Sequence, residues 1–352
     1  MAFLRLVLAV FFIGLSAVPL PAEDKPIQVP WDYRLGQGLR IADTAIRLGG
    51  YLGLNYYDQG GDPGVLKFDD LSLFVFGDIS PEWRFFSEIE KSHFFSIDTN
   101  SEITDKNRWE IERFFSEHVY SDALSLRIGK FLTPVGTWNE IHADPLTWTV
   151  SRPVVTSLSF PEHTTGLGLS GEFLAADQEL AYFVYLQNNE SIDEKTGERR
   201  THVMYGTRVR WFPSKGLEIA VPLLYYLEYE VDDRIYLTGL DLTYKKHPLE
   251  IRAEATSSRI DEKYGDWDRE YGWYLEGVWA FSEKIFAVAR HEYFRARKDE
   301  GRHTAFSIGA VYKPLPQLVF KTEFQARGGD LEIESAAIGS DDRFMASFSI
   351  LF

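Results

Sequence analysis

The chain has 352 residues, no cysteine, 15% aromatic residues and a formal net charge of −16 at pH 7. Without cysteine there is no disulfide framework and no thiolate metal site. An acidic chain that lacks clusters of Lys and Arg has no surface for a phosphate backbone, so no nucleic-acid partner is expected. Beyond the N-terminus, no uncharged apolar run reaches the roughly 20 residues of a membrane-spanning helix, which excludes a helical membrane protein.

The first element in chain order is an export signal. Arg5 precedes an apolar run at residues 6–18, and Pro19 and Pro21 follow it. The run is too short for a transmembrane helix, so residues 1–22 are expected to form a cleaved signal peptide. Ala22 is the favoured cleavage point, although Leu20 departs from the small-x-small pattern, and a retained anchor is the alternative. Residues 23–43 are then expected to form an N-terminal periplasmic segment.

Sixteen segments with a period of two follow, and each predicts a β-strand. The last is the clearest, because apolar side chains at 344, 346, 348, 350 and 352 alternate with Ser347 and Ser349. Such a strand shows lipid on one side and water on the other. The predicted strands are 44–57, 71–80, 83–90, 109–120, 124–130, 165–173, 180–187, 202–212, 217–229, 234–244, 249–255, 271–280, 285–293, 304–312, 318–325 and 344–352.

The connections between these strands alternate in length. Seven are short and rich in turn residues, and most of the other eight are long and polar, with 230–233 as a brief exception. This rhythm is typical of an outer-membrane barrel with an even number of strands and both chain ends at the short-turn rim. A β-sandwich or β-solenoid is the alternative, but neither explains the rhythm. The sequence therefore predicts an all-β, transmembrane, antiparallel up-and-down barrel of about 16 strands over residues 44–352.

Charged residues recur on the face opposite the apolar rows. In hydrocarbon each would cost about 2 to 4 kcal/mol near the midplane, so they are expected to line a wet interior. Cations and anions are nearly balanced among them, and the alternative is that many pair across strands and stiffen the wall. The predicted pore-lining residues are Arg47, Arg84, Glu88, Glu90, Glu112, Arg208, Arg210, Arg252, Glu254, Arg290, Glu292, Lys321 and Glu323.

The third long connection, residues 131–164, differs from the other loops. It contains Pro134, Trp138, Pro145, Trp148 and Pro153, which indicate a compact, packed segment rather than a flexible one. Sixteen strands enclose a lumen too wide for side chains alone to fill, so this segment is expected to fold inward and narrow it. The predicted constriction residues are Arg127, Lys130, Asn139, Glu140, His142, Asp144 and Arg152.

Residues 126–136 read LRIGKFLTPVG and are followed by Trp138, Asn139 and Glu140 and then by Ser151, Arg152 and Pro153. This motif resembles the porins related to the phosphate-selective outer-membrane channels. The resemblance is weaker around Glu88 and Glu90, around Glu112 and Glu117, at 239–244 and in the last two strands. It implies a trimeric barrel of sixteen strands whose third loop constricts the pore.

Ion selectivity is expected to differ from that of the phosphate-selective porins. An anion-selective pore needs an excess of cationic lumen residues. The balanced interior does not favour a strong anion preference, although Arg127, Lys130, Arg152, Arg208 and Arg210 could cluster at the constriction.

No catalytic residues, metal ligands or cofactor are expected, because the eight histidines are scattered and form no H-E-x-x-H motif, and no G-x-S-x-G motif occurs. His142 beside Asp144 is the best candidate for chemistry, and packing or solute contact is the favoured interpretation. The acidic segment 262–270 lacks the spacing of an EF-hand.

The predicted function is passive diffusion of small polar or ionic solutes, with anions such as phosphate among the candidates, through a water-filled channel. The expected partners are outer-membrane lipid, these solutes and two further copies of the chain in a homotrimer. The expected location is the outer membrane of a Gram-negative bacterium. The alternative is an outer-membrane barrel enzyme or a closed adhesion barrel that acts through its surface loops.

Overall fold

The computed structural model describes residues 32–59, 64–98, 103–104, 108–192, 199–229, 231–263, 265–331 and 339–352. The predicted signal peptide, residues 1–22, lies outside these ranges, and its cleavage stays a prediction.

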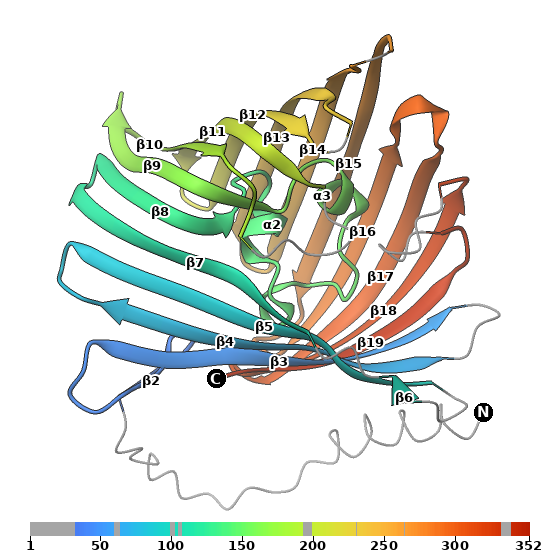
Figure 1. The fold of residues 1–352 in the computed structure, drawn as a ribbon. Helices are drawn as coiled ribbons and strands as arrows, with labels where there is room; N and C mark the ends of the chain where they lie inside the picture. The colour runs from blue at the N-terminus through green and yellow to red at the C-terminus, as the bar shows by residue number, and fades with distance from the viewer. Residues whose placement is uncertain are drawn as a thin grey trace, which may run out of the picture.

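Sixteen long strands form one antiparallel barrel (Figure 1). Each pairs with the next in the chain, and the last pairs back with the first, where Phe348 lies opposite Leu54. Closure satisfies the backbone donors and acceptors that an open edge would expose to hydrocarbon. The predicted fold class is confirmed. The strands are β3 (Ile46–Gln59), β4 (Val65–Asp78), β5 (Trp83–Asp98), β7 (Arg108–Ser121), β8 (Leu124–Leu132), β9 (His163–Ala175), β10 (Gln178–Asn188), β11 (Thr201–Ser214), β12 (Leu217–Glu228), β13 (Arg234–Lys246), β14 (Leu249–Asp261), β15 (Trp267–Ala280), β16 (Ile285–Arg295), β17 (Arg302–Leu315), β18 (Leu318–Gly329) and β19 (Arg343–Leu351).

Three short strands extend this sheet. β1 (Tyr33–Arg34) pairs with β2 (Gly38–Arg40), and β2 pairs with β3, so part of the predicted periplasmic segment joins the start of the barrel. The Arg47 guanidinium secures the junction by donating to the Asp32 carboxylate at 2.5 Å. β6 (Ile103–Thr104) pairs with β5 near the long-loop rim.

Several strands run further toward the long-loop rim than the sequence predicts. β14 extends to Asp261 and β15 begins at Trp267, so most of the connection between the predicted strands 249–255 and 271–280 is strand. The predicted loop bounds are wrong there because alternation of apolar and polar residues marks only the part of a strand that faces lipid. Backbone pairing continues beyond it through polar residues, as between Arg259 and Arg269.

The helices in the described part of the chain are short. Between β8 and β9 lie α2 (Thr137–Ile141), η1 (Asp144–Leu146) and α3 (Val154–Leu158), and η2 (Arg297–Asp299) precedes β17. Among the described residues, none of these helices has the length and apolar character needed to cross a membrane.

The two faces of the strands differ as the period of two predicts. Leu48, Tyr205 and Leu223 are exposed on the outer face, whereas Arg47 and Met204 on the inner face are buried. The interior is less polar than predicted, because three buried apolar clusters occupy parts of it. They are centred on Tyr226 beneath β10–β14, on Tyr274 at β15–β16, and on Phe74 at β3–β5.

Candidate functional site

The connection between β8 and β9, residues 133–162 and hereafter the L3 segment, binds inward side chains of distant strands. Its helices α2 and α3 lie within the ring of strands in Figure 1. The backbone N–H of Trp138 donates to Glu254 on β14 at 2.7 Å, and that of Val154 donates to Glu292 on β16 at 3.2 Å. Both carboxylates are buried. Glu254 and Glu292 are predicted to line the pore, and in the structure both bind the L3 segment.

Glu323 on β18 binds the L3 segment through three hydrogen bonds. Its carboxylate accepts hydrogen bonds from the backbone N–H groups of Val150 and Ser151 at 2.8 and 2.9 Å and from the Ser151 hydroxyl. Lys321 on the same strand donates to the Thr147 hydroxyl at 2.8 Å. One strand thus supplies both an anion and a cation to the middle of the L3 segment.

Arg290 on β16 is buried and completes this contact. Its guanidinium donates to the Thr149 hydroxyl and to the Ser151 carbonyl at 2.5 and 2.9 Å. Three carboxylates surround it within 4 Å, those of Glu276, Glu292 and Glu323. A charge this deeply buried is tolerated only when it is fully paired, so Arg290 joins the L3 segment to three strands.

Arg208 on β11 holds the beginning of the L3 segment. Its buried guanidinium donates to the Glu140 carboxylate and to the Gly136 carbonyl, and it lies 3.1 Å from the Asp241 carboxylate. Gly136 has φ of +75°, and a Cβ there would lie 2.1 Å from Oε2 of Glu254. Only glycine fits this position without displacing the carboxylate that binds α2.

Replacing Gly136 with Ala is therefore expected to lower the free energy of unfolding by about 2 to 3 kcal/mol, through left-handed strain and loss of the Glu254 contact. Urea unfolding in lipid vesicles, followed by tryptophan fluorescence, measures this. Gly277→Ala is the control, because no atom lies within 4 Å of its Cβ position, and it should change stability by less than about 0.5 kcal/mol. Equal stability of both variants would contradict the placement of α2.

Several predicted constriction residues make hydrogen bonds within the L3 segment. Arg152 donates to Glu162 at 2.6 Å and to Oδ1 of Asn139 at 2.8 Å, and its guanidinium lies over the Trp138 ring. Asn139 is fully buried and donates to the carbonyls of Thr133 and Glu162. Arg152 and Asn139 thus fix the fold of the segment, and their predicted place at the constriction stays a prediction.

Other predicted residues lie inside the barrel but bond to the wall. Asp144 accepts from Asn55 of β3 at 3.1 Å, and Lys130 donates to the Ile111 carbonyl at 2.7 Å. Glu90, Lys130 and Arg252 are buried, and Arg252 donates to Glu250 at 2.6 Å. These contacts correspond to the alternative in which charges stiffen the wall.

A cavity of about 500 Å³ lies at the short-turn end of the lumen, against β5, β7–β11 and the start of the L3 segment. Its lining brings together five arginines and four acidic residues, with three phenylalanines between them: Arg84, Arg113, Arg127, Arg208 and Arg210; Glu117, Asp122, Glu140 and Glu172; Phe115, Phe131 and Phe183. Both charge signs thus meet at one water-accessible surface, where a polar solute would find donors and acceptors together.

Most arginines of this cavity are paired. Arg127 donates twice to Glu117, at 2.7 and 2.9 Å, and its guanidinium lies 4.3 Å from the centre of the Phe115 ring. Arg210 donates to Glu218 at 2.7 Å. Because each acidic partner cancels much of the field of its arginine, the lining carries only a small excess of positive charge.

Sequence reasoning missed Arg113. A β-bulge shifts the register of β5 and β7 between Glu88 and Ile89, so that Glu88 faces Arg113 while Ile89 faces Ile111. The extra residue, Glu112, reverses the parity of β7, so Arg113 turns inward and donates to the buried Glu88 at 2.5 Å. A strict period of two gives no sign of such a bulge.

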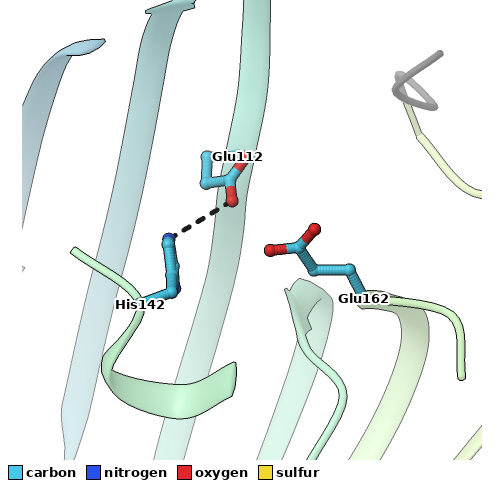
Figure 2. Close-up of side chains that lie close together, drawn as sticks. All are labelled: Glu112, His142 and Glu162. Carbon is cyan, nitrogen blue, oxygen red and sulfur yellow. Dashed lines mark ion pairs between the residues drawn. The ribbon is translucent and has the colours of Figure 1, made fainter. Parts of the chain in front are cut away.

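A second group of side chains joins the wall to two parts of the L3 segment. Figure 2 shows Glu112 of β7, His142 after α2 and Glu162 before β9 with their polar groups turned toward one another. Nε2 of His142 lies 3.4 Å from Oε1 of Glu112, and the donor atoms of all three residues lie within 4.8 Å of one another. Burial lowers the pKa of His142, against the opposing effect of Glu112.

Comparisons with known proteins extend these observations. No family model matches the chain. An uncharacterized protein of Aquifex aeolicus (strain VF5) is 28% identical over 153 residues, which are 42% of this chain and only 33% of that protein.

Solved structures resemble the whole barrel. They include an anion-selective porin from Comamonas acidovorans, with a TM-score of 0.63, 11% identity and coverage of 88% of this chain and 100% of that one. The outer membrane channel DcaP of Acinetobacter baumannii has a TM-score of 0.61, 11% identity and coverage of 90% and 99%. OmpT of Vibrio cholerae, in its trimer form, has a TM-score of 0.60, 10% identity and coverage of 87% and 99%. At such low identity the likeness concerns the fold, so the chain has the barrel architecture of outer-membrane porins, and the resemblance to phosphate-selective porins gains no confirmation.

Proposed function

We propose that the protein is an outer-membrane channel for passive diffusion of small polar or ionic solutes. The observation that carries this proposal is the attachment of the middle of the L3 segment to one wall, beside a charged cavity. The middle of the segment is bound to β14–β18, whereas the charged cavity remains against β5 and β7–β11. Because the middle of the segment occupies the side of the lumen next to β14–β18, solutes would pass through the space that remains on the opposite side.

The location and assembly belong to the same proposal. A closed barrel with an apolar outer face suits the outer membrane of a Gram-negative bacterium, reached through the predicted cleaved signal peptide. Outer-membrane lipid would surround it. The trimer form of the similar OmpT structure supports a homotrimer, as does the resemblance of residues 126–136 to trimeric porins.

Weak ion selectivity is the expected outcome for the wild-type channel, because the cavity lining is nearly balanced in charge. In a KCl gradient across a planar bilayer, the reversal potential should stay well short of the Nernst limit for either ion. Arg127→Ala leaves Glu117 without the guanidinium that donates twice to its Oε2, so this variant should shift the reversal potential toward cation preference. Arg234→Ala, at an exposed rim position, is the matched control and should not shift it.

A strong anion preference with block by phosphate would overturn this expectation and favour the phosphate-selective alternative. An unchanged reversal potential in Arg127→Ala would remove the β7–β8 side of the cavity from the conduction path.

The three buried apolar clusters favour a second candidate function. Tyr226, Tyr274 and Phe74 and their neighbours fill parts of the interior that the sequence predicts to be wet. A barrel filled in this way throughout would be closed, and it would act through its surface loops in adhesion. Purified protein that forms no pores would support this second function over the first.

A further inference from the structure

We propose that Glu112, His142 and Glu162 form a binding site for a first-row divalent transition-metal ion, for which Zn²⁺ is the probe. The site would fasten the turn after α2 and the end of the L3 segment to β7. This inference goes beyond the channel function and does not depend on it, because metal binding is measured without ion conduction.

The donor set selects the class of metal. One imidazole nitrogen and two carboxylates are ligands that Zn²⁺, Mn²⁺ or Fe²⁺ accept, whereas Ca²⁺ and Mg²⁺ prefer oxygen alone. Glu112 and Glu162 both supply anionic oxygens for a divalent cation, and Arg152 also pairs with Glu162. Nε2 of His163 on β9 also lies 3.1 Å from Oε1 of Glu112, but His163 is outside the group of three whose donors lie within 4.8 Å of one another.

The distances are close to those of a metal site. In a tetrahedral site with bonds of about 2.1 Å, neighbouring donor atoms lie about 3.4 Å apart. The separation between Nε2 of His142 and Oε1 of Glu112 is 3.4 Å, and the three donors span at most 4.8 Å. A rotation of the Glu162 side chain, which is partly exposed, would close the remaining gap.

The imidazole of His142 is oriented as metal-ligating histidines are. Its Nδ1 lies 3.1 Å from the carbonyl oxygen of Asn139, so Nδ1 carries the proton and donates it there. The lone pair of Nε2 then points toward Glu112, and this nitrogen makes no hydrogen bond in the structure. Ligating histidines commonly donate the other ring N–H to a backbone carbonyl, which fixes the tautomer.

A second layer of contacts positions the ligands. Arg152 donates to Oε1 of Glu162 and to Oδ1 of Asn139, so one guanidinium holds a ligand and the residue that orients His142. The Asn139 side chain also donates to the Glu162 carbonyl at 3.2 Å. Such supporting contacts typically change metal affinity by about 10- to 100-fold. Arg152 is therefore a positioning residue for this site.

The test uses the full mature protein, refolded in detergent after chelation. Titration calorimetry with Zn²⁺ should show one site per chain, and Co²⁺ should give the visible absorption of a site with nitrogen and oxygen ligands. His142→Gln and Glu162→Gln should weaken Zn²⁺ binding by more than about 100-fold, and Arg152→Ala by about 10- to 100-fold. Heat-modifiable migration on SDS gels checks that each variant is folded.

His303→Gln is the matched control. Nε2 of His303 lies 3.5 Å from Glu292 in a similarly buried pair, but in the described part of the chain no third metal-binding donor joins it. This variant should bind Zn²⁺ as the wild type does. The proposal is overturned if the wild type binds neither Zn²⁺ nor Co²⁺ stoichiometrically, or if folded His142→Gln keeps the wild-type affinity.

Discussion

Replacing Arg290 with Ala is expected to lower the free energy of unfolding by about 3 to 5 kcal/mol and to raise single-channel conductance. The substitution leaves Glu276, Glu292 and Glu323 buried around a lost cation, and a broken buried ion pair costs about this much. It also removes the donors that bind Thr149 and Ser151. The middle of the L3 segment should then leave the β16–β18 wall.

Urea unfolding in vesicles measures the stability change, and planar-bilayer recording measures the conductance. Arg234→Ala is the control for stability, since its ion pair with Asp261 is largely exposed and is expected to contribute less than about 1 kcal/mol. If folded Arg290→Ala channels kept both wild-type stability and conductance, the anchoring role of Arg290 would be refuted.

A disulfide between the L3 segment and the wall is expected to reverse the conductance gained in Arg290→Ala. Ser159 lies at the end of α3, and its Oγ is 2.9 Å from Oγ1 of Thr256 on β14. The chain contains no cysteine, so a Ser159→Cys, Thr256→Cys pair can form only the intended disulfide within one chain. Combined with Arg290→Ala, this pair should allow conductance to fall on oxidation and to rise again on reduction.

The matched control is the same cysteine pair with Arg290 intact, where oxidation should change conductance little because the segment is already attached. Quantification of free thiols confirms that the disulfide has formed. A fully oxidised triple variant whose conductance stayed at the reduced level would show that movement of the L3 segment does not control the passage.

The barrel could be predicted from the sequence because its signals are local. Alternation in each strand and the long-short rhythm of the connections depend on neighbouring residues, so strand number and the inward direction of Arg290 and Glu323 followed from them. The positions of the strand ends near the long-loop rim could not be predicted. Strands that extend beyond the lipid stay paired without an apolar face, as β14 does up to Asp261.

The functions of individual inward residues could not be predicted in the same way. Glu323 accepts from Ser151, which lies 172 positions away in the chain, and no local pattern indicates such a partner. Arg113 was missed because a bulge reverses the parity of β7. His142 and Glu112 come from separate elements and meet only after the L3 segment packs against the wall.

Single-channel recording of the purified wild-type protein in planar lipid bilayers tests the central claim most directly. The proposed passage beside the L3 segment, through the charged cavity against β5 and β7–β11, predicts discrete, reproducible current steps that are proportional to voltage. A correctly folded protein that inserts into the bilayer and carries no current would contradict the claim and identify a closed barrel.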